Sequence, residues 1–582
     1  MQLNVLQLGC CLTLVQAVLA YTDKELKDMF KETFGNIEKE TINGEVTVDY
    51  GSVPTWLAGN FMRHACGAFG ETNNMNDSLP NYIEHLFDCL QIGSKYHVEN
   101  GDISFTQRWY ETTVNEIYNT YGRQMNQSSV FMETAFSKVN KEMVDKWEAE
   151  MSNKSRVSSV PDVSWWQIGN QAVAMTEIPI GVIIDNGDVS QKGWIKYNDD
   201  HLGIPDTPEY GFTNNPAHEQ TEQDGTLWST LVVTHFVSQT HLKIKRIVYK
   251  VGSDLVRHVV GAYHHQDADL SKCKGNEPYP DFSSRFGYMH SFCITKNYII
   301  LPETGYLHDP CVYRRYDKYV PFFKQGFHYE PNGFTRLLVM RKSDGEFVAN
   351  ITMSPFFVTH QLGAYEDGEV INMDMLTYDN ANIYTKYTYL KNLDMPYTTD
   401  ISRITINMTD FTARMRSLRT KDKDLAAFEM SNINHAYNGK KYTYGYMAMN
   451  FDRRERNAVT KVCKLNVDTG EEIHYTFPEG LFVQEPNFVP HPNSSSEDDG
   501  VIVAQGIDGR KHKGFMVIID AKTMELIAHV TAPDMTLLGL HSRFFPLYVG
   551  RKGISGTAAS HSFNNIPVIT ILILLMHYIL QT

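Results

Sequence analysis

From about residue 45 to residue 548, the sequence is a succession of short apolar or alternating stretches separated by turns rich in Gly, Asn and Asp. Alternation of apolar and polar residues on both sides of a turn is typical of paired β-strands, as in YHVENGDISFTQRWY and GFMVIIDAKTMELIAHV. Helical patterns are confined to residues 22–40 and 134–152. A long chain made mainly of strands is expected to form a closed barrel or a propeller, because both leave few strand edges exposed.

Four of the 22 histidines stand at the mouth of such a strand: His218, His290, His360 and His541. The first three recur at intervals of 72 and 70 residues, which fits one ligand from each of several successive units around a common axis. Neutral imidazoles held on a rigid scaffold can bind a transition metal and leave coordination positions open. On ligand softness alone, iron, copper, zinc and nickel suit such a set about equally.

Three glutamates lie in apolar runs, where an unpaired charge is costly to bury: Glu177, Glu429 and Glu485. A carboxylate that accepts the Nδ1–H of a metal-binding imidazole avoids that cost and fixes the tautomer of the ring. We therefore expect these glutamates to lie behind the histidines.

The sequence around these residues resembles the carotenoid cleavage oxygenases, a family that includes the retinoid isomerohydrolase of the vertebrate eye. YMHSF contains His290, FEMSNIN contains Glu429, EPNFVPHP begins at Glu485 and LHSRFFP contains His541. LAGNFMRH and HLFDCLQI near the beginning resemble the opening strand and the HWFDG segment of the family. The resemblance covers about residues 45–548.

The resemblance implies an all-β fold, a seven-bladed β-propeller with the metal on its axis and a cap of loops and helices over the metal site. We accordingly treat residues 21–550 as one domain. It also implies Fe(II) held by the four histidines, with Glu177, Glu429 and Glu485 behind three of them. The implied reaction is cleavage of a conjugated C=C bond of a carotenoid or apocarotenoid by O₂ into carbonyl products, with no organic cofactor.

Several positions depart from the family pattern. His218 follows Pro216-Ala217 where the family has a threonine-alanine-histidine-proline run, Gly363 replaces an asparagine, and Cys293 replaces a glycine. Arg63 is followed by His64-Ala65-Cys66 instead of glycine-proline. We expect these changes to affect the shape of the substrate tunnel and the position of cleavage.

Other polar clusters fit the site less well. We interpret His264, His265, Asp267 and Asp269 as a solvated acidic loop, and His64, His85 and His435 as residues that match no ligand position. The sequence has no G-x-S-x-G, P-loop or G-x-G-x-x-G motif. A formal net charge of −15 argues against a nucleic-acid partner.

Two other functions stay open at this stage. A retinoid-ester isomerohydrolase would use the same iron without incorporating O₂. An extracellular carotenoid- or retinoid-binding protein would hold the same apolar polyene without turnover.

The two ends of the chain have features of processing signals. Residues 1–20 resemble a signal peptide, with Val18 and Ala20 at the −3 and −1 positions of the expected cleavage site. Residues 551–582 contain small residues followed by the apolar run IPVITILILLMHYILQT, which is typical of a GPI-attachment signal, although a membrane-spanning tail is the alternative. We therefore expect the protein at the extracellular face of the cell membrane, where a tethered enzyme could take its substrate from the lipid surface.

Sequons and cysteines fit a secretory route. N-x-Ser/Thr triplets begin at Asn76, Asn126, Asn153, Asn350, Asn407 and Asn493. Without Cys10 and Cys11, six cysteines remain, which allows one or two disulfides in an oxidising compartment. Cys273 and Cys311 are the first pair expected, and Cys293 is expected to be a buried small hydrophobic residue.

Overall fold

The computed structural model describes residues 21–547 apart from 70–84, 113–162, 178–180, 196, 200, 206, 208, 316–325, 393–394, 396, 421–425 and 451–458. The expected signal peptide (1–20), terminal anchor (551–582) and helix (134–152) lie outside the described residues. So do the sequons at Asn76, Asn126 and Asn153.

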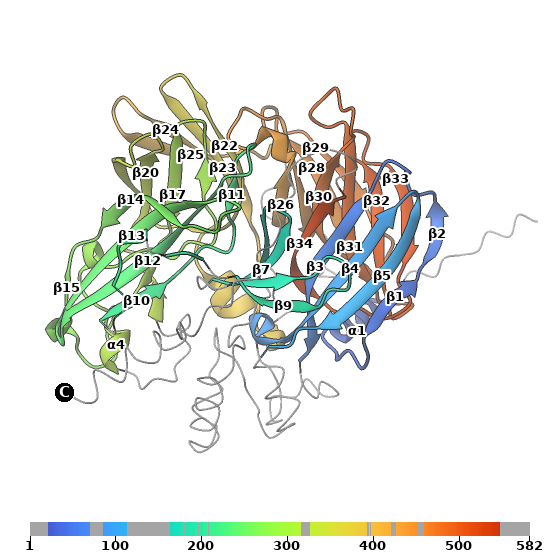
Figure 1. Ribbon diagram of the computed structural model, residues 1–582, viewed down its shortest axis with the longest axis horizontal. Helices are drawn as coiled ribbons and strands as arrows, with labels where there is room; N and C mark the ends of the chain where they lie inside the picture. Colours follow the sequence, from blue (N-terminus) through green and yellow to red (C-terminus); the bar gives the residue numbers. More distant parts are fainter. Residues whose placement is uncertain are drawn as a thin grey trace, which may run out of the picture.

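Within the described residues the strands form seven sheets of four or more strands, arranged as the blades of a propeller (Figure 1). The predicted seven-bladed fold is confirmed. Blade 1 contains β34 (Gly539–Pro546), β3 (Gly59–Ala68), β4 (Leu90–Glu99), β5 (Asp102–Trp109) and β1 (Thr41–Glu45). Blade 2 contains β6 (Ser164–Ile168), β7 (Gln171–Met175), β8 (Gly181–Ile184) and β9 (Gln191–Trp194). Blade 3 contains β10 (Tyr210–Thr213), β11 (Gln220–Thr221), β12 (Leu227–Ser238), β13 (His241–Val251), β14 (His258–His264) and β15 (Ala268–Asp269).

The other four blades follow in chain order. Blade 4 contains β16 (Cys293–Ile294), β17 (Tyr298–Glu303), β20 (Thr335–Arg341) and β21 (Phe347–Met353). Blade 5 contains β22 (Phe357–Asp367), β23 (Val370–Tyr378), β24 (Asp400–Asn407) and β25 (Thr412–Ser417). Blade 6 contains β26 (Ala427–Ile433), β27 (Tyr444–Asn450), β28 (Lys461–Asn466) and β29 (Glu472–Thr476). Blade 7 contains β30 (Leu481–Pro490), β31 (Gly500–Asp508), β32 (Lys513–Asp520), β33 (Leu526–Thr531) and β2 (Thr47–Gly51).

Short elements surround the blades. They are α1 (Asp23–Glu32), η1 (Leu86–Asp88), η4 (Leu270–Lys272), η5 (Phe282–Ser284), α4 (Val312–Arg315), η6 (Ile383–Tyr387), η7 (Leu390–Asn392), η8 (His435–Tyr437) and the two-stranded sheet of β18 (Tyr306–His308) and β19 (Phe327–Tyr329). None of the described helices combines the length and hydropathy that crossing a bilayer requires.

The first helix is shorter than the predicted 22–40. Thr22 caps its beginning with a capping box to Glu25, and Thr33 ends it, with its side chain bonded to the carbonyl of Phe30. Beyond Gly35 the chain is extended and pairs with β3 through a bridge from Asn36 to Ala68. The helical pattern was therefore right in type but too long at its C-terminal end.

The ring is closed by strands from opposite ends of the chain. β34 pairs with β3, with Arg63 opposite Ser542, so that a late strand forms the inner edge of the first blade. At the outer edge of the last blade, β2 pairs with β33, with Thr47 opposite Thr531. In Figure 1 these blue and red strands lie side by side at the right of the molecule. These two strand pairings, β34 with β3 and β2 with β33, close the ring and leave no inner strand edge exposed.

The core lies between neighbouring blades. One apolar cluster joins blades 1 and 7 through Phe61, Tyr96, Val503 and Ile518, all fully buried or nearly so. Other clusters join blade 4 to blade 5 and blade 5 to blade 6. The middle strand β32 is buried on both faces because each blade packs against a neighbour on either side, which explains its continuous apolar sequence GFMVII.

Disulfides join Cys66 to Cys89 and Cys273 to Cys311. The second pair is the one expected from the sequence. Cys293 and Cys463 are free and buried, and Cys293 packs in the apolar cluster between blades 4 and 5, as predicted.

A buried ion pair fixes the contact between blades 5 and 6. Arg403 donates two hydrogen bonds of 2.7 Å to the carboxylate of Asp374, and the hydroxyl of Tyr442 donates a third of 2.6 Å. The ring of Tyr442 also fills the space beside Gly363, where an added Cβ would lie 2.9 Å from Cε1. The glycine at the position of the family's asparagine is thus required by the tyrosine of the next blade.

We predict that Asp374→Asn lowers the free energy of unfolding by about 3 kcal/mol, because it leaves the buried Arg403 guanidinium with only the more distant carboxylate of Asp468, 3.9 Å away. Chemical denaturation in urea would measure the change. Asp367→Asn, on the same sheet but exposed, is the matched control and should change stability by less than about 0.5 kcal/mol. Equal stabilities for the two variants would contradict the role given to the ion pair.

Candidate metal centre

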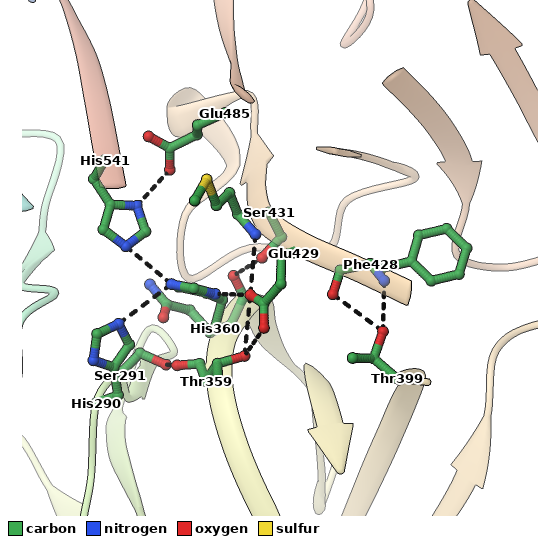
Figure 2. A network of polar contacts seen from close by, with 12 residues as sticks. His290, Ser291, Thr359, His360, Thr399, Phe428, Glu429, Ser431, Glu485 and His541 are labelled. Carbon is green, nitrogen blue, oxygen red and sulfur yellow. Dashed lines mark hydrogen bonds and ion pairs between the residues drawn. The ribbon is translucent and has the colours of Figure 1, made fainter. Parts of the chain in front are cut away.

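Four histidines converge at the centre of the ring. The Nε2 atoms of His360 and His541 lie 3.0 Å apart, those of His218 and His541 lie 3.1 Å apart, and those of His290 and His360 lie 3.3 Å apart. One ligand atom from each ring lies within 4.8 Å of the others. His290, His360 and His541 are buried and His218 is partly buried. Figure 2 shows His290, His360 and His541 pointing toward one another, His360 and His541 from strands and His290 from the segment before a strand.

Each blade supplies either one histidine of this centre or one of the glutamates near it. His218 precedes β11 in blade 3, His290 precedes β16 in blade 4, and His360 lies in β22 of blade 5. His541 lies in β34 of blade 1. Blades 2, 6 and 7 supply Glu177, Glu429 and Glu485, respectively. The intervals of about 70 residues between the first three histidines are therefore the distances between successive blades.

Irregular pairing lets these strands turn the required side chains toward the axis. The register shifts between Val358 and Gln361 in β22, between Glu429 and Asn432 in β26, and between Val483 and Pro486 in β30. Opposite Arg63–Ala65, the same kind of shift places an extra residue in β34 beside His541. Such bulges bend a strand and redirect its side chains, and each of these four lies at a residue of the centre.

Carboxylates accept hydrogen bonds from three of the four rings. The Nδ1 atoms of His290 and His360 lie 2.5 Å from Glu177 and Glu429, respectively, and Nδ1 of His541 lies 2.9 Å from Glu485. An ionised carboxylate only accepts, so a ring bonded to one carries its proton on Nδ1 and its lone pair on Nε2. Within the described part of the chain, no carboxylate bonds to His218.

The carboxylates are held in turn by donors that sequence analysis missed. Tyr288 donates to Glu177, Tyr378 donates to Glu429, and Thr359 bonds to Glu429 at 3.1 Å. The backbone N–H of Ser542 lies 2.5 Å from Glu485. Three of these donors are neighbours in sequence of a centre histidine: Tyr288 precedes His290 by two residues, Thr359 directly precedes His360 and Ser542 directly follows His541. Tyr378 comes from the neighbouring strand β23, and only the pairing of strands brings it to Glu429.

Burial sets the protonation of the centre. It lowers the pKa of His218 and of His360 well below the usual range, and the neighbouring histidines lower it further. It also raises the pKa of Glu429 to about 8, against the hydrogen bonds from Met430 and Thr359, which lower it. His218 and His360 are therefore neutral at pH 7 and need not lose a proton before they bind a cation. A cation at the Nε2 atoms would favour the ionised carboxylates behind them.

The donor set fits a transition metal ion. The Nε2 atoms of His290 and His360, and those of His360 and His541, face each other as lone pairs with no proton between them, an arrangement that a cation relieves. Two nitrogens that lie about 2.1 Å from one ion and at right angles to each other are about 3 Å apart, which agrees with the observed 3.0–3.3 Å. An all-imidazole set suits iron, copper, zinc or nickel.

An apolar cavity opens beside the histidines. Its wall includes His290, His360 and His541, and its remaining lining comes both from inner strands and from α1, η1 and η6, which cover this end of the ring. The aliphatic and aromatic members of the lining are Phe30, Leu86, Phe87, Val163, Ile383, Tyr384, Tyr387, Tyr397, Met430, Ala448, Val459, Phe482, Val483, Leu538 and Leu540. Such a cavity fits an apolar ligand next to a metal.

The remaining histidines singled out from the sequence lie elsewhere. His64 is buried, stacks on Trp165 at 3.9 Å, and bonds to Tyr110 and Ser164. His85 bonds the carbonyl of Tyr384 at 2.9 Å and so fastens η6. His435 lies in η8 and outside the four-histidine group.

The interpretation of residues 264–269 as a solvated loop was wrong for His265. His264, Asp267 and Asp269 are exposed, but the His265 ring is fully buried and its Nε2 lies 3.3 Å from Glu303. Glu303 also accepts hydrogen bonds of 2.7 Å from Arg246 and Arg336. The His265 side chain turns inward because it lies against the buried Glu303 carboxylate, which two arginines also bind.

A second group of ligand types, Cys463, Glu472 and His474, also lies within 4.8 Å in the described residues. Arg419 already donates to Glu472 at 2.9 Å, and His474 lies 3.1 Å from its other oxygen. A guanidinium at the carboxylate opposes a further cation, so this group is an ion-pair cluster between strands.

Comparison with known proteins gives a consistent result. The family model described as Retinal pigment epithelial membrane protein matches residues 34–546. Carotenoid cleavage dioxygenase 8 of Arabidopsis thaliana is 24% identical over 538 residues, covering 88% of this chain and 85% of its own. Carotenoid isomerooxygenase of Galleria mellonella is 23% identical over 540 residues, covering 87% and 94%.

Solved structures agree on the fold. A Glu150Asp mutant of the Synechocystis apocarotenoid oxygenase superposes with a TM-score of 0.68 at 17% identity, covering 90% of this chain and 99% of that one. The cobalt-substituted form of that enzyme gives a TM-score of 0.68 at 16% identity, with the same coverage.

We predict that Glu429→Gln weakens Fe(II) binding about tenfold to hundredfold. The glutamine amide can donate to Nδ1 of His360, which favours the tautomer whose Nε2 carries the proton and cannot bind metal. Anaerobic titration of metal-free protein would measure the dissociation constant. Glu366→Gln, on the same strand as His360 but bonded to Thr295 and Asn297, is the matched control. An unchanged dissociation constant in Glu429→Gln would show that the carboxylate does not orient the ring.

Proposed function

Because the chain belongs to the carotenoid cleavage oxygenase family, which the Retinal pigment epithelial membrane protein model describes, we propose that it is an Fe(II)-dependent dioxygenase acting on a carotenoid or apocarotenoid. The observation that carries the proposal is the convergence of four imidazole Nε2 atoms at the wall of an apolar cavity. His218, His290, His360 and His541 would hold the iron, and Glu177, Glu429 and Glu485 would orient three of the rings.

The proposed reaction splits one conjugated C=C bond and joins one atom of O₂ to each carbon, which yields two carbonyl products. The two carbons lose four electrons in total, and O₂ gains them, so no further reductant is needed. Bound ferrous iron would supply the redox chemistry that couples O₂ to the polyene. Neutral ligands would leave the charge of the ion intact.

The residues of this chain would position the substrate and exclude water. The aromatic side chains of Phe87, Tyr384, Tyr387 and Tyr397 line the cavity and offer flat apolar faces to a rigid conjugated chain. The hydroxyl of Tyr384 lies 3.1 Å from that of Tyr288 and donates to it, since Tyr288 gives its one proton to Glu177, so the wall and the carboxylates form one network. A polyene held against this wall would present one particular double bond to the centre.

We expect purified protein reconstituted with Fe(II) to cleave at least one member of a carotenoid and apocarotenoid panel, with one atom of ¹⁸O from ¹⁸O₂ in each carbonyl product. Product identification by mass spectrometry would measure this. His360→Ala should lower kcat/KM by at least about a hundredfold, because a ligand of the ion is lost. Isomerised retinol without ¹⁸O from O₂ would indicate an isomerohydrolase, and bound polyene without turnover would indicate a binding protein; either result would contradict the proposal.

We also propose that the protein acts at the extracellular face of the cell membrane, tethered through residues 551–582. Two disulfides fit an oxidising compartment, and the apolar cavity fits a substrate dissolved in lipid. The terminal sequence supports a GPI anchor.

Phosphatidylinositol-specific phospholipase C should therefore release the protein from intact cells, and deletion of residues 556–582 should yield secreted protein. Immunoblots of medium and membrane fractions would measure both. Retention of the shortened chain on membranes would contradict the proposed tether.

A further inference from the structure

One amide group in the wall of the cavity is not used by the metal centre. Gln484 lies in β30 directly before Glu485, at the bulge between Val483 and Pro486. The extra residue of the bulge lets two consecutive side chains serve the interior: Glu485 bonds to His541, and Gln484 lines the cavity. Gln484 is only 3% exposed.

Behind Gln484 lies a buried cation. Arg63 is fully buried, and its guanidinium donates to Oε1 of Gln484 and, at 2.9 Å, to the carbonyl of Leu537. No ion pair joins it to a carboxylate of the described residues. Burial lowers the pKa of Arg63 to about 10, against the neighbouring Tyr96, so the group is still charged at neutral pH. The Arg63 charge is stabilised by neutral oxygens alone, and it therefore strongly polarises the adjacent amide of Gln484.

The arginine fixes the orientation of the amide. A guanidinium has donors and no acceptor, so the oxygen of Gln484 must face Arg63 and the –NH₂ group must face away from it. Within the described part of the chain, Nε2 of Gln484 has no hydrogen-bond partner. The hydroxyls of Thr359 and Thr388 in the same lining are already bonded to Glu429 and to the carbonyl of Ile383. A polarised donor thus stands without an acceptor in a wall that is otherwise largely apolar.

We propose that Nε2 of Gln484, polarised by Arg63, donates a hydrogen bond to an oxygen atom of the bound polyene. The preferred substrate class is therefore an oxygenated polyene with a carbonyl or hydroxyl group, such as an apocarotenal, and not a pure hydrocarbon carotene. This inference rests on the proposed function, since it concerns the substrate of the same site. An oxygen at this point would also fix how far the polyene enters, and so which double bond meets the centre.

The test compares an apocarotenal with a hydrocarbon of the same polyene length. Binding to the metal-free full chain, measured under anaerobic conditions by quenching of tryptophan fluorescence, needs no turnover. The wild-type protein should bind the aldehyde about tenfold more tightly. Gln484→Glu retains an oxygen for Arg63 but removes the –NH₂ donor, so the preference should fall to about one. The ratio of kcat/KM for the two substrates should change in parallel.

Two further variants complete the experiment. In Gln484→Met, the methionine side chain has a similar length but no donor, so this variant should lose the preference as well. It replaces Gln484→Glu in the comparison if the glutamate variant does not fold. Tyr397→Phe removes another hydroxyl of the lining and should retain the preference. Loss of the preference in Tyr397→Phe with its retention in Gln484→Glu would overturn the inference.

The two proposals fail in different ways. If the wild-type protein binds and cleaves polyenes but does not prefer the oxygenated one, the proposed function stands and the inference is wrong, with water as the partner of Gln484. If it neither binds nor cleaves any polyene, both are wrong.

Discussion

The hydrogen bond from a buried imidazole to a carboxylate is the interaction on which the centre depends. When the carboxylates are ionised, this bond places the proton of His290, His360 and His541 on Nδ1 and leaves the lone pair of each Nε2 directed toward the axis. Without the carboxylates, either ring nitrogen could carry the proton, and an Nε2 that carries the proton could not bind a metal ion. Tyr288 and Tyr378 donate hydrogen bonds to Glu177 and Glu429, respectively, and so hold these carboxylates in position behind the histidines.

The propeller makes the arrangement possible because it brings distant parts of the chain to one point. Every blade supplies one histidine or one glutamate, and the strand exchange that closes the ring is also what supplies His541. The closure is therefore both structural and functional: the strand that completes blade 1 carries a ligand. Bulges next to His360, Glu429 and Glu485 interrupt the regular ladder where these side chains turn inward.

Much of this could be predicted from the sequence, for definite reasons. The strands of a propeller are local hairpins, so alternation and turn residues reveal them; Asn100 and Gly101, both with positive φ, form the turn expected in YHVENGDISF. The four histidines were found because each has a characteristic local neighbourhood. The link between Arg63 and Gln484 spans 421 residues and has no local pattern, so only the folded chain shows it. His265 was misjudged for the same reason, since its partners lie on other strands.

X-ray absorption spectroscopy of the iron-loaded protein tests the central claim most directly, because it reports the number and kind of atoms bound to the metal. The account predicts one iron per chain, with nitrogen neighbours and the outer-shell scattering of four imidazoles. Sulfur neighbours, or scattering from two imidazoles or fewer, would contradict it.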